Sequence, residues 1–368
     1  MKNKKIMFAI GSLARGGAEK VISILASQCA KNGLDVALVL LNNTERAYKV
    51  SDKVKIYQTQ ADGKRLKEFV CIKQAKEFVK EFNPDIIVPF LPLTTLCFFL
   101  VNIGIGKKII VSERADPYRK LSESTQGIKH KIVHILIRNL KMLTLGSHMI
   151  FQTPDAQKYY GKKAATKGTV IPNPLDTSAL PERFEGEREK KIVAAGRFSE
   201  EKNFPMLLRA FARFRKEFPK YTLELYGEGG LRGQLETLCK QLNVEDSVLM
   251  PGFVGGLADR MVNAAMYIST SNHEGISNSM LEALGMGVPT IVTDCPVGGA
   301  KMFVKTDENG ILIEMNDEEA LYNAMVKIAS DKEYSEKISQ NAIKIREELS
   351  AEKITEKWIE VFEKVISK

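Results

Sequence analysis

The chain has 368 residues, which is more than one core of ordinary size usually serves, so two domains are expected. Apolar residues make up 44% and charged residues 27%, a balance that excludes a fibrous or an intrinsically disordered chain. Lysine and arginine outnumber aspartate and glutamate by 54 to 45, which predicts an anionic partner: a nucleic acid, a membrane surface or a phosphorylated substrate. The five cysteines have no C-x-x-C spacing, as expected for reduced thiols in a cytoplasmic protein.

The first half of the chain alternates predicted strands and helices. The apolar strand at 5–10 runs into a loop with Gly16 and Gly17, and residues 18–29 carry apolar side chains at helical spacing. The pattern repeats up to a strand that begins at Lys108, which predicts a parallel sheet flanked by helices. The glycine loop lacks the G-x-G-x-x-G fingerprint, so no dinucleotide cofactor is expected, but it still allows close approach of a ligand.

Two stretches of this half are apolar enough to raise the question of membrane contact. Residues 86–106 include no charge over 21 residues, long enough to cross a bilayer, but prolines and glycines divide them into a strand, a short helix and a second strand. Residues 127–145 form a basic, apolar helix that could lie on anionic lipid or pack normally with lysines at its edges. His130 and His134 lie one turn apart in this helix, but no third ligand is nearby, so no metal site is expected.

The boundary between the two domains is marked by proline. Residues 170–176 contain Pro-Asn-Pro, which can continue neither a helix nor a strand, and residues 181–191 are charged and aperiodic. We therefore expect an N-terminal domain at 1–172, a linker at 173–190, a second domain at 191–349 and a C-terminal helix at 350–368 that packs back toward the first domain.

The second half opens with the same order of strand, glycine-bearing loop and helix. A strand at 192–195 leads to Gly196 and to two cations, Arg197 and Lys202, before a helix with Pro205 in its first turn. Cations at the carboxyl edge of a parallel sheet are well placed to bind a diphosphate, although a solvated charged loop would look the same in isolation. Two further strands with glycine-bearing loops are expected at 222–226, before Glu228, and at 248–251, before Gly252 and Phe253.

The most informative stretch contains two carboxylates separated by seven residues, Glu274 and Glu282. Glu274 precedes Gly275 in a loop, and Glu282 lies in the short helix that follows. Backbone N–H groups at such a helix start attract anions, and carboxylates accept hydrogen bonds from sugar hydroxyls. The alternative is that Ser279 and Glu282 form a capping box and that Glu274 is a solvated loop residue.

Taken together, these motifs resemble the retaining glycosyltransferases of family 4. That family has the α/β GT-B fold, in which two Rossmann-like domains have a ligand cleft between them. A single E-x7-E pattern is weak, but six motifs in the family's order cover essentially the whole chain. They are Gly16-Gly17-Ala18-Glu19, Ile171-Pro172-Asn173, Gly196-Arg197 with Lys202, Gly227-Glu228-Gly229, Gly252-Phe253 and Glu274-x7-Glu282.

The resemblance implies roles for the matching residues. Arg197 and Lys202 would grip the diphosphate and stabilise it as it leaves, and Glu274 would lie beside the transferred sugar; these three are the implied catalytic residues. Glu282 would hold the ribose, Gly252-Phe253 would form the base-binding edge, and the Gly16-Gly17 loop would close on the phosphates. The implied donor-binding residues are Gly16, Gly17, Gly196, Arg197, Lys202, Glu228, Gly252, Phe253, Glu274, Gly275, Ile276, Ser277, Asn278 and Glu282.

The resemblance also implies a reaction without a bound cofactor or metal ion. The nucleotide sugar, expected to be a UDP-linked hexose or N-acetylhexosamine, is a substrate, and the leaving phosphate takes the acceptor's proton. No aspartates are spaced as D-x-D, the metal-holding motif of the other large glycosyltransferase fold.

The sequence departs from the family in two places. Ile276-Ser277 stand where Phe-Pro is frequent, and residues 112–116 stand where many members have a histidine, which leaves Glu113 and Arg114 as candidates on the acceptor side. Residues 294–300 look most like members that build bacterial surface glycans on lipid carriers. We therefore expect a glycan acceptor linked to polyprenyl diphosphate, and a cytoplasmic protein that contacts the inner face of the membrane.

Two rival functions remain. A nucleotide-sugar epimerase of the same fold would need extra acid and base groups, yet the chain has four histidines and only His273 stands beside a motif. A non-catalytic protein that binds nucleotide sugars or other anions would keep the fold without the chemistry. Nucleic acid is not expected as a partner, because lysines are spread over helix surfaces and most aromatic residues have core spacing.

Overall fold

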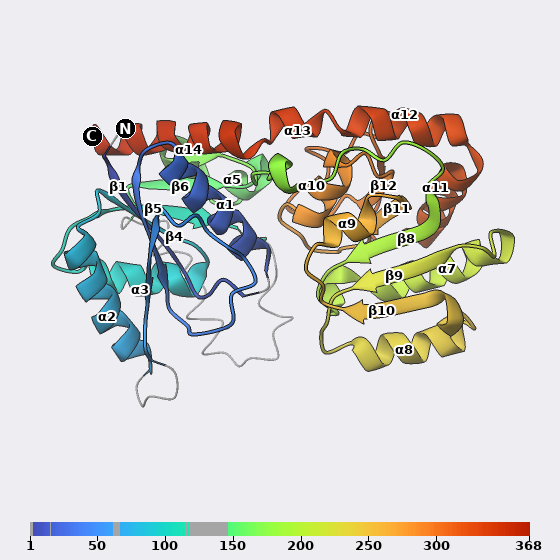
Figure 1. Cartoon of the computed structure of the whole chain (residues 1–368), viewed down its shortest axis with the longest axis horizontal. Coiled ribbons are helices and arrows are strands. Elements are labelled where there is room, and N and C mark those ends of the chain that lie inside the picture. Colours follow the sequence, from blue (N-terminus) through green and yellow to red (C-terminus); the bar gives the residue numbers. More distant parts are fainter. Residues whose placement is uncertain (1–2, 15, 62–66, 115, 118–145) are drawn as a thin grey trace. The chain divides into compact units, whose positions relative to one another are not determined.

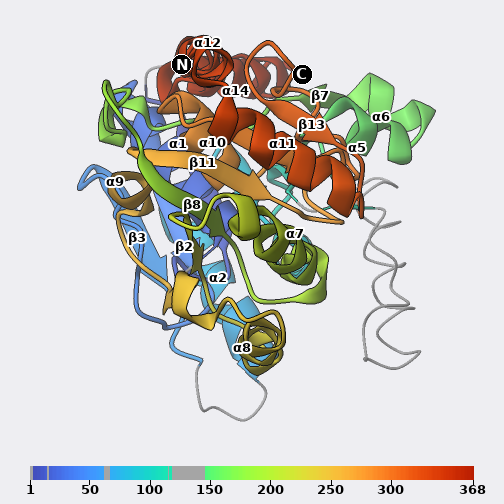
Figure 2. The same ribbon diagram turned by 90° about the vertical axis from the view of Figure 1, so that its right-hand side faces the viewer.

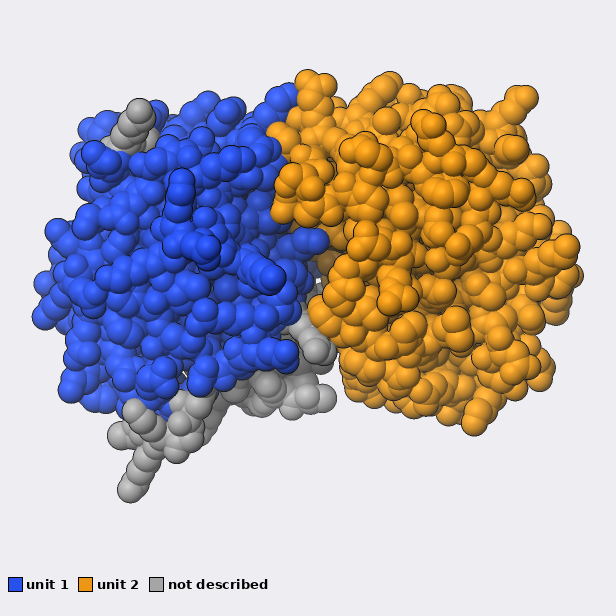
Figure 3. Space-filling model, in the orientation of Figure 1, with its two compact units in different colours: residues 1–174, 351–368 blue, residues 175–350 orange. Residues whose placement is uncertain are grey.

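The computed structural model describes residues 3–14, 16–61, 67–114, 116–117 and 146–368. It divides into two compact units (Figures 1 and 3). Unit 1 comprises Met1–Pro174 and Ala351–Lys368, and unit 2 comprises Leu175–Ser350. Most of the segment expected as a linker, 173–190, therefore belongs to unit 2, whose first strand already begins at Glu189. The helix expected at 127–145, with His130 and His134, lies outside the described residues.

Unit 1 is built on a seven-stranded parallel sheet with the order β3-β2-β1-β4-β5-β6-β7. The chain builds outward from β1 to β3 and then returns to place β4 on the other side of β1, so the strand order reverses between β1 and β4. Such a reversal leaves a crevice at the carboxyl ends of the strands in doubly wound folds. The strands are β1 (Lys5–Ile10), β2 (Asp35–Leu40), β3 (Val54–Gln58), β4 (Ile86–Pro89), β5 (Lys108–Glu113), β6 (His148–Phe151) and β7 (Gly168–Val170).

The helices of unit 1 include the last one of the chain. This helix, α14, contacts α1 and buries Trp358 and Phe362 against the sheet, where the Phe362 ring lies 6.3 Å from that of Phe8. The uncharged stretch at 86–106 forms β4 and α3, and within the described residues no helix is long and apolar enough to cross a bilayer. The helices are α1 (Gly17–Lys31), α2 (Lys67–Phe82), α3 (Pro92–Asn102), α5 (Pro154–Tyr159), α6 (Lys162–Lys167) and α14 (Ala351–Ile366).

Unit 2 repeats this topology with a six-stranded parallel sheet in the order β10-β9-β8-β11-β12-β13. Its strand order reverses between β8 and β11. The central strands β11 and β12 are buried almost throughout, as expected for strands covered on both faces. The strands are β8 (Glu189–Ala195), β9 (Thr222–Tyr226), β10 (Val248–Gly252), β11 (Ala264–Ser269), β12 (Thr290–Thr293) and β13 (Ile311–Ile313).

Helices cover both faces of the second sheet. On one face α7 contacts α8 and α11 and buries Leu207, Phe211 and Phe214 in the core (Figure 2). On the other, α10 contacts α12 and α13. The helices are α7 (Phe204–Glu217), α8 (Arg232–Gln241), α9 (Leu257–Met261), α10 (Asn278–Gly285), α11 (Glu318–Ser330), α12 (Lys332–Ala342) and α13 (Ile345–Glu348).

Candidate active site in the second unit

The candidate site lies at the carboxyl ends of β8 and β11, the two strands between which the order of the second sheet reverses. The loop after β8 carries Arg197 and Lys202, and the loop after β11 carries Glu274. Because the strands are parallel and adjacent, their loops emerge at the same edge, which is where doubly wound folds bind ligands. The topology therefore brings together residues that are more than 70 positions apart in the sequence.

A glycine makes room for the lysine of this site. A Cβ atom on Gly196 would lie 2.9 Å from Cε of Lys202, closer than real Cβ contacts. Gly227 follows β9 with a φ of +144°, and a Cβ there would lie 1.9 Å from the carbonyl oxygen of Gly196. The glycines of two predicted motifs thus let the β8 and β9 loops pack closely, and Gly196 gives the Lys202 side chain its path.

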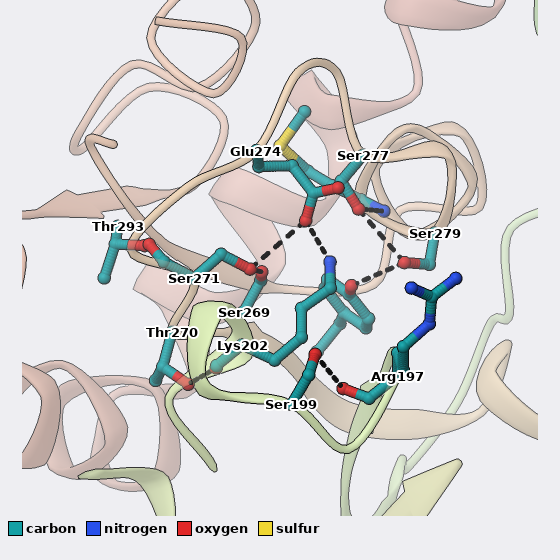
Figure 4. A network of polar contacts seen from close by, with 12 residues as sticks. Arg197, Ser199, Lys202, Ser269, Thr270, Ser271, Glu274, Ser277, Ser279 and Thr293 are labelled. Carbon is teal, nitrogen blue, oxygen red and sulfur yellow. Dashed lines mark hydrogen bonds and ion pairs between the residues drawn. The ribbon is translucent and has the colours of Figure 1, made fainter. Parts of the chain in front are cut away.

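Lys202 and Glu274 form an ion pair in the interior of the site (Figure 4). The lysine Nζ donates to Oε2 of Glu274, which also accepts a hydrogen bond of 3.2 Å from the Ser271 hydroxyl. The two side chains are 16% and 25% exposed. Burial alone would lower the pKa of Lys202, but the Glu274 carboxylate outweighs it and raises that pKa above its usual value. The lysine is therefore a fixed positive charge at neutral pH.

Arg197 differs from Lys202 in its surroundings. It is exposed, and no hydrogen bond or ion pair of its guanidinium occurs within the described part of the chain. Its side chain extends toward Ser279 at the start of α10 (Figure 4). The site thus combines a buried, paired cation with an exposed cation that has five N–H donors available for an anionic ligand.

Three hydroxyl groups that the sequence did not single out as a set line the same site. Tyr267, in β11, is fully buried and its hydroxyl lies 2.7 Å from that of Ser279. Ser279 in turn lies 3.1 Å from the Ser277 hydroxyl. Tyr267 occurs in the apolar strand 264–269, where the pattern favours a core residue. Only its hydrogen bond with Ser279 in α10 identifies it as a site residue.

The N-cap of α10 corrects one alternative taken from the sequence. The Ser277 hydroxyl accepts a 3.3 Å hydrogen bond from the N–H of Met280, so Ser277 is the cap residue and a Ser279–Glu282 capping box does not form the helix start. Glu282 lies further along α10 and is 5% exposed. Ser277 and Asn278 stand at the helix start, and Ile276 is buried beneath them. The ligand roles of all four residues stay predictions.

The backbone of Glu274 is held by the segment that follows β12. Its N–H donates to the carbonyl of Pro296 at 3.0 Å, and its own carbonyl accepts from the N–H of Val297 at 3.1 Å. A Cβ on Gly299 would lie 1.9 Å from the carbonyl oxygen of Gly275, so this segment needs a glycine to approach the loop. Two stretches that appear as separate motifs in the sequence therefore form one structural element around the carboxylate.

The predicted base-binding edge lies at the end of β10. Gly252 has a φ of +84°, which favours glycine, and the following Phe253 is 39% exposed. Glu228 lies beside this turn and pairs with Arg232, whose guanidinium also donates to the carbonyl of Met250 at 2.8 Å. The turn is thus fixed by an ion pair from the start of α8.

The remaining predicted residues belong to unit 1. Gly16 and Gly17 begin α1. Glu113 is 5% exposed and accepts a 2.6 Å hydrogen bond from the hydroxyl of Tyr160. Arg114 is 9% exposed and donates to the Ser112 hydroxyl at 2.7 Å. Glu113 and Arg114 are therefore held by protein groups, and their acceptor role stays a prediction.

Metal ligands do not gather in this site. Across residues 3–14, 16–61, 67–114, 116–117 and 146–368, no group of three or more histidine, cysteine, aspartate or glutamate side chains is arranged to hold an ion. The positive charges at the candidate site come from Arg197 and Lys202.

Two protein-family models match this chain. The model described as Glycosyltransferase Family 4 matches residues 15–179, and the model described as Glycosyl transferases group 1 matches residues 178–345. An N-acetylgalactosamine-N,N'-diacetylbacillosaminyl-diphospho-undecaprenol 4-alpha-N-acetylgalactosaminyltransferase of Campylobacter jejuni is 31% identical over 355 residues, which cover 89% of this chain and 91% of that protein.

Two further comparisons agree with these matches. A second N-acetylgalactosaminyltransferase of Campylobacter jejuni, named for a GalNAc-GalNAc-diNAcBac-PP-undecaprenol substrate, is 25% identical over 98% of this chain and 99% of that protein. Among solved structures, the sucrose-phosphate synthase of Thermosynechococcus elongatus superposes with a TM-score of 0.86 at 17% identity, over 99% of this chain and 100% of that one. The similarity to the sucrose-phosphate synthase concerns the fold alone.

Proposed function

Because the chain belongs to the family 4 glycosyltransferases and has the GT-B fold, we propose that it is a retaining, metal-independent enzyme that uses a nucleotide sugar. The family and the fold expected from the sequence are confirmed. Glycosyl transfer in polysaccharide or glycan biosynthesis is the activity that follows from this membership. The donor, the stereochemistry and the acceptor are the finer parts of the proposal.

The observation that carries the proposal is the pair of cations at the carboxyl edge of the second sheet. Departure of a nucleoside diphosphate places negative charge on the leaving oxygens, and fixed positive charge beside them lowers that barrier. Lys202 is held in place by Glu274, so it need not reorganise when the charge develops. Arg197 is exposed and can close on the same phosphates with two parallel hydrogen bonds.

Glu274 has the second role in this mechanism. Its carboxylate has one oxygen engaged by Lys202 and Ser271, and a carboxylate has further acceptor positions for hydroxyl groups. We assign these positions to the transferred sugar, next to the bond that breaks. The leaving phosphate then takes the proton of the acceptor hydroxyl on the same face, which retains the anomeric configuration and requires no protein nucleophile.

The acceptor in this proposal is a glycan on a lipid carrier. The Campylobacter relative that is 31% identical is named for a substrate on diphospho-undecaprenol. The excess of nine positive charges favours contact with an anionic membrane, where such a carrier resides. We therefore propose that the enzyme works at the inner face of the cytoplasmic membrane.

A thermal-shift panel in EDTA tests the donor and the independence from metal ions together. The ligands are UDP, GDP and ADP with UDP-glucose, UDP-galactose, UDP-N-acetylglucosamine, UDP-N-acetylgalactosamine and GDP-mannose. A ligand at 100 times its Kd stabilises the folded state by about 2.7 kcal/mol, which raises the melting temperature by a few degrees. We expect a response to uridine nucleotides and a larger one to a single UDP sugar.

Other outcomes of the panel would change the proposal. A response that appears only when Mg²⁺ or Mn²⁺ replaces EDTA would contradict metal independence. A response to guanosine nucleotides alone would replace uridine as the base. No response to any of the eight ligands, in EDTA or with metal, would contradict the nucleotide-sugar donor itself.

A further inference from the structure

The chain of hydroxyl groups next to the two cations has a defined order. The Tyr267 hydroxyl lies 2.7 Å from that of Ser279, and Ser279 lies 3.1 Å from Ser277. The Ser277 oxygen also accepts the N–H of Met280 at 3.3 Å. Each hydroxyl has one hydrogen to donate and two lone pairs that accept, so these contacts restrict where the hydrogens point.

The Tyr267 end of this chain favours donation toward Ser279. One lone pair of Ser277 is already used by the Met280 N–H, and its hydrogen can point to Ser279 or to Tyr267, whose hydroxyl it also contacts. Tyr267 is fully buried, and a phenol is a better hydrogen-bond donor than an aliphatic alcohol. Burial also raises the pKa of Tyr267, so its hydrogen is retained at neutral pH although Lys202 lies close enough to oppose this rise. Ser279 then accepts from Tyr267, and its own hydrogen points to Ser277 or to a ligand, of which a charged phosphate oxygen is the stronger acceptor.

We propose that Ser279 donates this hydrogen bond to the diphosphate of the nucleotide-sugar donor, and that Tyr267 is a positioning residue that holds the Ser279 hydroxyl in that direction. The proposal rests on the function proposed above, because the cations Arg197 and Lys202 define where the diphosphate lies. Ser279 is partly exposed and faces the Arg197 side chain (Figure 4), whereas Tyr267 is fully buried. The serine can therefore touch the ligand and the tyrosine cannot.

The test is a double-mutant cycle measured by calorimetric titration with UDP and, separately, with uridine. A hydrogen bond to a charged group is worth about a factor of ten in affinity, so Ser279→Ala should weaken UDP binding about tenfold. Tyr267→Phe should weaken it about threefold, and Tyr267→Phe in the Ser279→Ala background should have no further effect. Uridine, which has no phosphate, should bind all of these variants equally.

Two controls separate this effect from a loss of folding. Ser279→Thr keeps the hydroxyl and should retain UDP affinity within a factor of about two, whereas Ser279→Ala should not. Tyr221→Phe removes the hydroxyl of a buried tyrosine just before β9. This residue lies at the amino ends of the strands, away from the carboxyl edge that carries the site, and its substitution should leave UDP affinity unchanged. If Tyr267→Phe does not fold, the comparison of Ser279→Ala with Ser279→Thr still decides whether the serine hydroxyl binds the phosphates.

The outcomes distinguish this inference from the proposed function. If UDP binds the wild type and Arg197→Ala weakens it, but the Ser279 and Tyr267 effects simply add, the positioning role of Tyr267 is excluded. If Ser279→Ala weakens uridine as much as UDP, the contact with phosphate is excluded. If none of UDP, GDP and ADP binds the wild type, the proposed function fails, and this inference fails with it.

Discussion

The carboxyl edges of the two sheets carry arginines that have opposite surroundings. In unit 1, Arg114 follows β5 and is buried, with its guanidinium 5.4 Å from the ring of Phe90 and 5.2 Å from that of Trp358. Burial lowers the pKa of Arg114 to about 9. In unit 2, Arg197 follows β8 and is exposed. The same topology therefore places the same residue type in two different environments.

Arg114 contacts residues close to both points at which the chain passes from one unit to the other. Its guanidinium donates to the side chain of Asn173 at 3.1 Å, just before the first passage, and contacts Trp358 on the helix that follows the second. The two passages themselves are joined where the N–H of Leu175 donates to the carbonyl of Leu349 at 2.7 Å. An arginine at a sheet edge is therefore not in itself a sign of ligand binding. Its access to solvent and its partners decide its role.

The largest effect that would sharpen this comparison is on turnover. Arg197→Ala and Lys202→Ala should each reduce the rate of sugar transfer at least ~100-fold, the scale of losing one donor that stabilises the transition state. The matched control is Arg209→Ala, which removes an exposed arginine on α7 that pairs with Glu318. The rate is measured as nucleoside diphosphate released from the donor that the panel identifies. Near-normal turnover in both site variants would contradict the assignment of Arg197 and Lys202 as ligands of the diphosphate.

The second expected effect is on stability. Here the substitution of Arg114 should have the larger effect and that of Arg197 the smaller one. Arg114→Met should lower the free energy of unfolding by about 2 kcal/mol, because it removes the donor to the buried Ser112 hydroxyl and one of the two donors to Asn173 Oδ1, the other being Gln152. Arg197→Met should change it by less than about 0.5 kcal/mol, as is usual for an exposed side chain. Urea denaturation of the two variants measures both values. Equal losses would show that burial does not separate the two arginines.

The third expected effect is a pH dependence of stability that arises from one histidine in unit 1. His148, at the start of β6, is buried beside Thr169, and burial together with Lys364 and Lys368 lowers its pKa to about 4. Its unfolded pKa is about 6.5, so between these values the unfolded chain binds the proton and the folded protein does not. Stability should therefore be constant well above pH 6.5 with respect to this group and fall by about 2 kcal/mol by pH 5.

A matched variant isolates this contribution. His148→Gln keeps a polar side chain near Thr169 but cannot titrate, so the difference in melting temperature between pH 7.5 and pH 5 should shrink relative to the wild type. Melting curves at four pH values between 5 and 7.5 are sufficient. If the variant and the wild type lose stability in parallel, the histidine is not the cause.

Local sequence patterns are sufficient to predict the architecture and most of the donor-side candidates. Alternating apolar strands and helices predict two parallel sheets, because the period of each pattern depends on local geometry alone. The glycine loops and the E-x7-E spacing are equally local, and they led to Arg197, Lys202, Glu274 and Glu282 before any contact was known. The proline-rich exit near Asn173 was found in the same way, because proline restricts its own neighbourhood.

Which side chains meet depends on contacts between segments that are distant in the sequence. Lys202 and Glu274 are 72 residues apart and form one ion pair because β8 and β11 are neighbours in the sheet. Tyr267 lies in an apolar strand, and a strand pattern indicates that a side chain is buried but not which hydroxyl group its own hydroxyl contacts. Arg114 is a candidate on the acceptor side from the sequence, and the structure adds that it contacts Trp358, which α14 brings from the far end of the chain. Packing between distant segments, which no local pattern encodes, fixed these roles.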